Sequence, residues 1–315
     1  MLLEVSDLSV IYSAGNKVVR AVNNVSFDLE KGEVLGIIGE SGSGKSTLAN
    51  AIIRAIKPPG KIVSGRVIYK GKDLLEMPYD EFRKIMWKEI SYVPQASQNA
   101  LNPVITVYDS FKYVADSHGF NDEKALREKV SELMKLVGLD PKRVLNMYPF
   151  QLSGGMRQRV MIALSMLLDP ELIIMDEPTS ALDMLNQELI LKLIKSINKE
   201  MQISIIYITH DILNVAQIAD RLFVMYKGYM MEDGKTEDII KDPLNPYTQL
   251  LISSIPPLKG EIKNINVKED TSYYVSGCPF LSRCDHAFER CKELPSVFLY
   301  KNRKVRCWLY EPHGA

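Results

Sequence analysis

A nine-residue stretch near the start of the chain constrains its fold more than any other feature. The stretch follows the apolar run 34–38, precedes a helical pattern over about 45–55, and fits G-x-x-x-x-G-K-S in full. In such a loop the backbone N–H groups and the N-terminus of the following helix converge on a phosphate group. The sequence therefore predicts a strand, a phosphate-binding loop and a helix in that order. The predicted loop residues are Gly39, Glu40, Ser41, Gly42, Ser43, Gly44, Lys45, Ser46 and Thr47.

Two acidic residues later in the chain complete a predicted site for nucleotide hydrolysis. Residues 172–175 are apolar and are followed by Asp176 and Glu177, which places both carboxylates at the C-terminal end of a buried strand. Lys45 is expected to reach the β- and γ-phosphates, and Ser46 to ligate Mg²⁺. Asp176 is expected to hold the same Mg²⁺, directly or through water, while Glu177 polarises the attacking water.

The remaining apolar patterns indicate an α/β fold. A helical pattern over 122–137 ends at Gly138 and predicts a helical part between two sheet-forming parts. A buried-strand run at 172–176, a helix over about 186–200 and a second apolar run at 203–209 follow one another. Strand, helix and strand in that order imply a parallel sheet. Shorter strands are expected at 3–10, 21–29 and 33–39.

Charge and hydropathy argue against two classes of protein. The formal net charge is zero and 25% of the residues are charged, whereas a chain that holds DNA or RNA through phosphate neutralisation has a strongly basic surface. No window of about 18 uninterrupted apolar residues exists, and the N-terminus lacks the basic start and apolar run of a signal peptide. The chain is therefore expected to stay in the cytoplasm and to bind no nucleic acid.

A third motif narrows the class of nucleotide-binding protein. Ser153 and the amides that follow it can form a second anion cradle at a helix N-terminus. With this motif between the phosphate loop and the acidic pair, the chain resembles the ABC ATPases. The resemblance implies that the motif faces the γ-phosphate bound by the opposite subunit. Its residues are Leu152, Ser153, Gly154, Gly155 and Met156.

The same resemblance implies roles for further residues, which occur in the order typical of the family. Gln95 is similar to the loop glutamine that senses Mg²⁺ and transmits to the membrane subunits, which gives an implied Mg²⁺ set of Ser46, Gln95 and Asp176. His210 resembles the switch histidine that contacts the γ-phosphate, and joins Lys45 and Glu177 as the catalytic group. Tyr12 is the candidate for stacking on adenine. The loop that contacts the opposite protomer is Ser180, Ala181, Leu182 and Asp183.

The resemblance also implies a domain organisation. The ABC ATPase fold has a RecA-like parallel-sheet core, an antiparallel β subdomain and a helical subdomain, which is expected at about 96–165. The nucleotide-binding domain is expected to span 1–242, and a C-terminal extension 243–315. Two such subunits are implied to sandwich two ATP molecules, to close on binding and to reopen after hydrolysis.

Two stretches resemble one subfamily, the oligopeptide and dipeptide permeases. Residues 148–163 look like the first, D-type, ATPase of the pair, with Met156 where many relatives carry Gln, and 245–251 resembles the start of that subfamily's C-terminal extension. This implies a peripheral ATPase on the cytoplasmic face of the membrane, powering import of di- and oligopeptides. The implied partners are two integral-membrane permease subunits, a second related ATPase and an extracytoplasmic substrate-binding protein. Oligosaccharides or nickel as cargo, a homodimer, and a soluble ABC ATPase that moves no solute remain alternatives.

The C-terminal module carries every cysteine of the chain. A Pro-rich stretch at 243–257 and a polar stretch at 259–274 are interpreted as a linker to this module, expected at about 277–310. Four thiolates in a short, loop-rich intracellular segment favour an iron-sulfur or zinc site. The resemblance implies a [4Fe-4S] cluster, with zinc and metal-free thiols as alternatives, and a module beyond a linker is expected to leave nucleotide binding intact when it is altered. The cysteines are Cys278, Cys284, Cys291 and Cys307.

Overall fold

The computed structural model describes residues 1–15, 17–95, 100–180, 182–254 and 276–312. The chain divides into two compact units. The first contains Met1–Glu30, Val34–Leu75 and Thr209–Ala315, and the second contains Lys31–Glu33 and Glu76–Ile208. Among the described residues, no helix has both the length and the apolar content of a membrane span.

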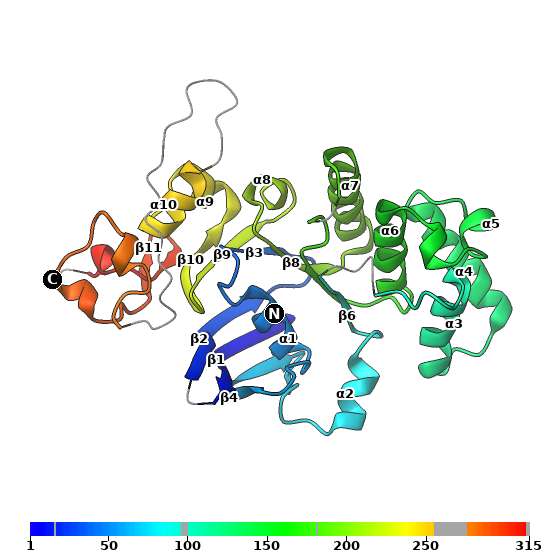
Figure 1. The fold of residues 1–315 in the computed structure, drawn as a ribbon, viewed down its shortest axis with the longest axis horizontal. Helices are drawn as coiled ribbons and strands as arrows, with labels where there is room; N and C mark the ends of the chain where they lie inside the picture. The colour runs from blue at the N-terminus through cyan, green and yellow to red at the C-terminus, as the bar shows by residue number, and fades with distance from the viewer. Residues whose placement is uncertain (16, 96–99, 181, 255–275, 313–315) are drawn as a thin grey trace. The chain divides into compact units, whose positions relative to one another are not determined.

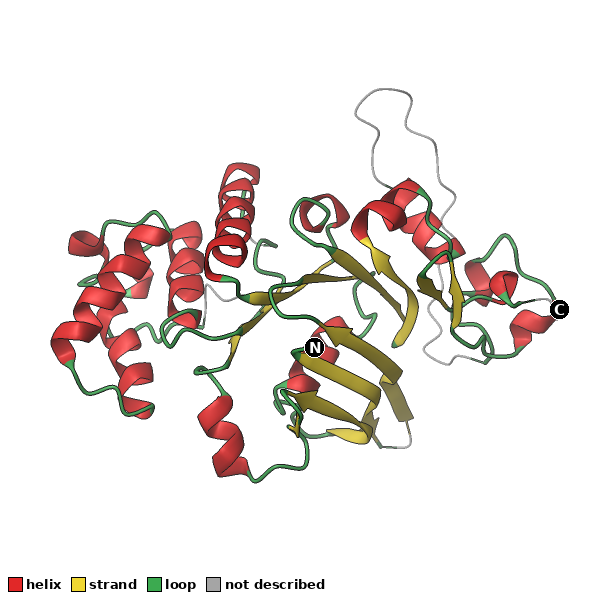
Figure 2. Ribbon diagram, turned by 180° about the vertical axis from the view of Figure 1, so that it is seen from behind, coloured by secondary structure: helices red, strands yellow, loops and turns green. Residues whose placement is uncertain are grey.

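The first unit contains a four-stranded antiparallel sheet, whose strands are among the yellow arrows of Figure 2. The strand order is β2-β1-β4-β5. The long strand β1 pairs with β2 on one side and with β4 on the other. The inward-facing residues Val25, Phe27 and Leu29 of β2 are buried and alternate with more exposed ones, as the pleat of a one-sided sheet requires. The strands are β1 (Leu3–Ala14), β2 (Lys17–Leu29), β4 (Gly60–Tyr69) and β5 (Lys72–Asp73).

A second set of strands in this unit carries the phosphate-binding loop. Their order is β11-β12-β10-β9-β3, with β3 parallel to β9 and the other neighbours antiparallel (Figure 1). The two short C-terminal strands, β11 and β12, therefore belong to the same sheet as β3, the strand that leads into the phosphate-binding loop. The strands are β3 (Val34–Ile38), β9 (Arg221–Tyr226), β10 (Tyr229–Lys235), β11 (Phe298–Tyr300) and β12 (Arg303–Val305). The helices are α1 (Lys45–Ile52), α8 (Ile212–Val215), α9 (Thr236–Lys241), α10 (Pro246–Ser253) and the 3-10 turns η3 (Leu281–Arg283), η4 (Glu289–Lys292) and η5 (Trp308–Tyr310).

The second unit combines three parallel strands with most of the helices. Strand β7 lies between β8 and β6 and is buried along its whole length, as its continuous apolar run predicts. The helix predicted over 122–137 is α4, and Asp122 caps it by accepting a hydrogen bond from the N–H of Ala125. The strands are β6 (Ile90–Val93), β7 (Leu172–Asp176) and β8 (Ser204–Thr209). The helices are α2 (Tyr79–Ile85), α3 (Val107–Ser117), α4 (Glu123–Leu136), α5 (Pro141–Val144), η2 (Pro149–Gln151), α6 (Gly154–Ser165) and α7 (Met184–Met201).

The stretch interpreted as the start of a linker is partly helical. Residues 246–253 form α10, which begins at a proline because the first helical residue needs no intrahelical N–H bond. Asn245 caps the helix by accepting a hydrogen bond from the N–H of Tyr247, and Tyr247 is fully buried. The linker interpretation is therefore wrong for this helix, because its tertiary contacts outweigh the Pro-rich composition. The polar stretch 259–274 lies outside the described residues.

Candidate nucleotide-binding site

The phosphate-binding loop connects β3 to α1 and approaches the neighbouring backbone closely. A Cβ atom on Gly39 would lie 2.1 Å from the carbonyl oxygen of Met225, and one on Gly44 would lie 2.1 Å from that of Ala21. Gly44 has a φ of +100°, which L side chains rarely adopt. It precedes α1 without a side-chain cap, so the first amides of this helix are not covered by a capping side chain. The glycines of the motif thus leave room for a tightly curled anion-binding loop.

Hydrogen bonds to the phosphate-binding loop hold the side chain of Lys45. The side chain is 5% exposed, and its Nζ donates hydrogen bonds to the carbonyl oxygens of Gly39 and Glu40 at 2.8 and 2.9 Å and to Oγ of Ser43 at 3.3 Å. These contacts keep the ammonium inside the loop, where a phosphate group is expected. Ser46 follows in the first turn of α1 and is half-buried.

Asp176 and Glu177 lie at the end of β7, as predicted. Asp176 is 1% exposed and accepts a hydrogen bond from Oη of Tyr92 at 3.3 Å. Burial, followed by the charge of Asp176, raises the pKa of the Tyr92 hydroxyl, so the hydroxyl stays protonated and donates. The sequence analysis did not identify Tyr92. The available signal was its position three residues before Gln95, in the short β segment Ile90–Val93.

Glu177 has an unusual backbone conformation. Its φ of +48° is in the left-handed region, which costs a non-glycine residue roughly 1–2 kcal/mol. Its N–H donates to the carbonyl oxygen of Ile208 at 2.9 Å, and its own carbonyl accepts from Oγ of Ser180 at 3.1 Å. Nε2 of Gln95 donates to Oε2 of Glu177 at 3.3 Å. The structure therefore brings Gln95, Glu177 and Ser180 together, and strain of this kind is typical of functional positions.

Ser153 caps the N-terminus of α6, as the third motif predicts. Its Oγ accepts a hydrogen bond from the N–H of Met156 at 3.3 Å, and Leu152 before it is buried. A Cβ atom on Gly155 would lie 2.9 Å from Oδ1 of Asn186, the third residue of α7. Gly155 therefore also lets two helices approach, a packing role that the sequence analysis did not include.

The other predicted residues are placed as follows. Asp183 caps α7 by accepting a hydrogen bond from the N–H of Asn186 at 3.0 Å, and Leu182 precedes it. Ala181 lies outside the described residues. His210 is exposed directly after β8, and Tyr12 is half-buried in β1.

The predicted catalytic and Mg²⁺ sets draw on both units of the structure. Lys45, Ser46 and His210 belong to the first unit, while Gln95, Asp176 and Glu177 belong to the second. Within each unit, the predicted residues lie on the loop or strand end that the sequence predicts for them. Their assembly into one site therefore stays a prediction.

The four cysteines line one small pocket in the C-terminal module. Cys278, Cys284, Cys291 and Cys307 all border it, and the N–H of Cys278 donates to the carbonyl oxygen of Cys291 at 2.8 Å. No disulfide joins them. Burial raises the pKa of the Cys278 thiol to about 12 and that of the Cys307 thiol to about 11, so both stay protonated at neutral pH unless a cation compensates the thiolate.

Four thiols in one pocket are the donor type that iron-sulfur and zinc sites use. The distances between these thiols, however, do not match those of a metal site. Within the part of the chain that the structure describes, no group of three or more His, Cys, Asp or Glu side chains lies close enough together to hold a metal ion. The predicted [4Fe-4S] cluster is thus not supported by this geometry and stays a prediction.

Comparison with known proteins agrees with the fold and the motifs. Residues 22–180 match the family described as ABC transporter, and residues 231–291 match the oligopeptide/dipeptide transporter C-terminal region. The dimeric post-hydrolysis structure of the ATP-binding cassette MJ0796, bound to ADP and Pi, aligns with a TM-score of 0.67 at 31% identity, covering 75% of this chain and 99% of that one. Fold and phosphate loop together define an ABC ATPase.

Two curated relatives cover almost the entire chain. The dipeptide transport ATP-binding protein DppD of Caldanaerobacter subterraneus subsp. tengcongensis is 45% identical over 99% of this chain and 98% of its own length. The oligopeptide transport ATP-binding protein AppD of Bacillus subtilis is 38% identical over 100% of this chain and 98% of its own. The chain belongs to the oligopeptide/dipeptide permease family of ABC transporter ATP-binding subunits. The predictions of the ABC ATPase fold and of this family are confirmed.

Proposed function

We propose that this ATPase powers the import of di- and oligopeptides from the cytoplasmic face of the cell membrane. The match of residues 231–291 to the oligopeptide/dipeptide transporter C-terminal region carries this proposal. The similar proteins named for dipeptide and oligopeptide transport support the same substrate class. ABC ATP-binding subunits pair with membrane permease subunits. We add to these a second, related ATPase and an extracytoplasmic substrate-binding protein.

The proposed mechanism assigns the following tasks to the residues of the site. Lys45 binds the β- and γ-phosphates, and the Gln95 amide, which donates to Oε2 of Glu177, keeps that carboxylate oriented to polarise water. Ser46, Gln95 and Asp176 would hold Mg²⁺, which would supply positive charge to neutralise the phosphates. His210 contacts the γ-phosphate.

Two further parts of the proposed mechanism concern the adenine ring and the opposite subunit. Tyr12 stacks on adenine. Ser153 and the α6 amides face the nucleotide of the opposite subunit, as do the residues at 180–183. Since ATP contacts both subunits only in the closed dimer, its binding favours closure.

Uptake by a reconstituted transporter tests the proposed substrate. The chain is co-expressed with its permease and ATPase partners, and uptake of a labelled dipeptide into proteoliposomes is measured with MgATP and a binding protein. We expect ATP-dependent dipeptide uptake that is lost in Lys45→Ala, because the loop then lacks its phosphate-binding ammonium. Uptake of a labelled oligosaccharide or of Ni²⁺ in place of the peptide would contradict the proposed cargo. A functional transporter containing one ATPase species would contradict the proposed heterodimer.

We also propose that Cys278, Cys284, Cys291 and Cys307 hold a [4Fe-4S] cluster, with zinc as the alternative metal. The donor type supports this proposal, because all four side chains that border the pocket from this set are thiols, whereas the spacing of the thiols in the structure does not. Protein purified without oxygen is expected to contain about four irons and four acid-labile sulfides per chain. Cys284→Ser is expected to lose most of that iron, whereas Ser282→Ala, two residues away and exposed, keeps it. One zinc ion per chain would favour the zinc site over the cluster. Protein without bound metal would contradict both the cluster and the zinc site.

A further inference from the structure

Arg283 connects the cysteine module to the phosphate-binding loop. Its guanidinium meets the carboxylate of Glu40 through two hydrogen bonds, Nη1 to Oε2 at 2.8 Å and Nη2 to Oε1 at 2.9 Å. The arginine side chain is 7% exposed and the glutamate side chain 38% exposed. A two-pronged contact of this kind fixes both position and orientation. It joins residues that are 243 positions apart in the chain and belong to the same unit.

An aromatic cluster holds the guanidinium in place. Arg283 lies 5.6 Å from the ring centroids of both Tyr226 and Phe280, and its Nη1 also donates to Oη of Tyr226 at 3.2 Å. Tyr226, Tyr247 and Phe280 contact one another, with centroids 4.4 to 5.6 Å apart. Oη of Tyr247 accepts the backbone N–H of Glu40 at 2.9 Å. Both the side chain and the backbone of Glu40 are therefore held by residues from the last third of the chain.

The negative charge of Glu40 makes its contact with Arg283 relevant to phosphate binding. Glu40 is the second residue of the loop, and its backbone carbonyl accepts a hydrogen bond from Nζ of Lys45, the predicted phosphate ligand. A carboxylate on a loop that is expected to bind phosphate groups would repel them unless a cation neutralises it. Arg283 supplies that cation and keeps the carboxylate turned toward the module.

We propose that Arg283 is a positioning residue for nucleotide binding. It neutralises and orients Glu40, and so makes ATP affinity depend on the folded state of the cysteine module. The dependence is direct because Arg283 is the last residue of η3 and Cys284 follows it in the chain. The expectation that changes in the module leave nucleotide binding intact is revised accordingly. This inference rests on the assignment of residues 39–47 as the nucleotide site.

Removing the arginine is expected to weaken MgATP binding by the full-length chain roughly tenfold, about 1.4 kcal/mol. In Arg283→Met the Glu40 carboxylate stays on the loop without its cation. Adding Glu40→Gln removes that negative charge, and the double variant is expected to bind within about threefold of the unaltered chain, the size of a small surface-charge effect. Dissociation constants are measured by calorimetric titration with MgATP.

Arg290→Met is the matched control. Arg290 lies in the same module but pairs with Glu311 and stacks on Trp308, 4.1 Å from its ring centroid, so its loss is expected to leave MgATP affinity unchanged. If Arg283→Met does not fold, as judged by thermal unfolding, Arg283→Lys takes its place. Lysine keeps the positive charge but cannot make the two parallel hydrogen bonds of the guanidinium. A smaller loss of affinity that Glu40→Gln again removes is then expected.

Two results would overturn the proposal. One is unchanged affinity in Arg283→Met, and the other is a double variant as weak as the single one, which would mean that the arginine acts only through the fold of the module. Failure of the nucleotide-site assignment looks different: MgATP binding would be absent in the unaltered chain or unaffected by Lys45→Ala. The peptide-uptake result does not enter this test, because titration needs no transport partner.

Discussion

Glu177→Gln is expected to lower the rate of ATP hydrolysis by roughly 10²–10⁴-fold while ATP still binds. Glutamine keeps the size and the hydrogen bond to Gln95, but it cannot polarise a water molecule as a carboxylate does. The rate is measured as phosphate release by the assembled transporter, and binding as the MgATP dissociation constant of the same variant. Because hydrolysis is needed to reopen the closed state, we also expect the variant to stay dimeric in ATP on size-exclusion chromatography.

Glu200→Gln is the control for this substitution. Glu200 is exposed on α7, where its carboxylate accepts from Oγ of Ser196, and its loss is expected to leave hydrolysis unchanged. Near-normal hydrolysis in Glu177→Gln would show that another group activates the water. Loss of ATP binding would show instead that the strained backbone at Glu177 needs the carboxylate in order to fold.

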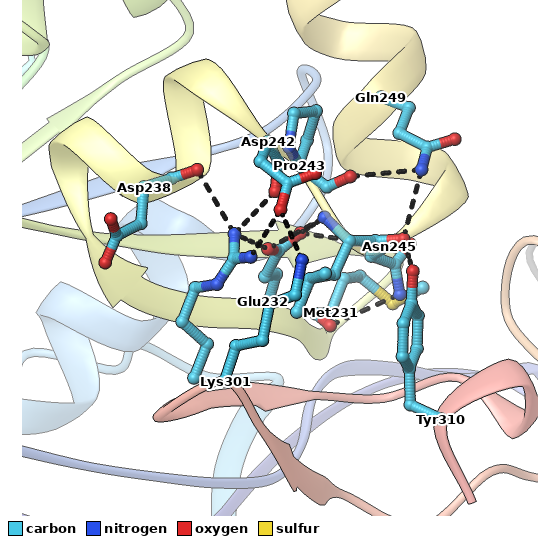
Figure 3. A network of polar contacts seen from close by, with 11 residues as sticks. Met231, Glu232, Asp238, Asp242, Pro243, Asn245, Gln249, Lys301 and Tyr310 are labelled. Carbon is cyan, nitrogen blue, oxygen red and sulfur yellow. Dashed lines mark hydrogen bonds and ion pairs between the residues drawn. The ribbon is translucent and has the colours of Figure 1, made fainter.

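Arg303→Ala is expected to reduce the free energy of unfolding by about 3–5 kcal/mol, because it removes one partner of a buried ion pair. Arg303 is 3% exposed, and its Nη1 donates to Oε1 of Glu232 at 3.2 Å and to the carbonyl oxygen of Asp242 at 2.7 Å. Glu232 is fully buried and also accepts the N–H groups of Leu244 and Asn245 (Figure 3). The substitution leaves this carboxylate buried without its cation.

The pH dependence of this loss follows from the sign of the Glu232 shift. Burial already raises the pKa of Glu232, so the charged form is less favourable in the folded state than in the unfolded chain. A raised carboxyl pKa contributes stability below the unfolded pKa and loses it as pH rises through the folded pKa. Without Arg303 the raised pKa rises further. The destabilisation in Arg303→Ala is therefore expected to shrink as the pH is lowered.

Lys301→Ala is the matched control for Arg303. Lys301 pairs with Asp242 at 2.9 Å, but the two side chains are 55% and 61% exposed, so the loss is expected to be much smaller than that in Arg303→Ala. Urea unfolding at two pH values measures both variants. Equal losses in Arg303→Ala and Lys301→Ala would show that the buried network does not hold β12 against β10.

The sequence alone was sufficient to predict those elements whose signal lies within a few neighbouring residues. The strand predicted at 172–176 is β7, and the helix predicted over 122–137 differs from α4 by one residue at each end. Periodicity and capping act over a few residues, so they can be read without knowing the fold. The phosphate loop, the acidic pair and the cap at Ser153 were located for the same reason.

What the tertiary structure decided involves residues far apart in the chain. The pairing of β12 with β10, the contact of Tyr247 with Glu40 and the clamp of Arg283 on Glu40 join residues separated by up to 243 positions. Sequence analysis interpreted 243–257 as part of a linker and assigned no role to Arg283. By itself the sequence determined the class of ATPase and predicted the members of its site, because motif chemistry is local. Only the tertiary structure placed the cysteine module against the phosphate loop, because an ion pair depends on which distant segments the fold brings together.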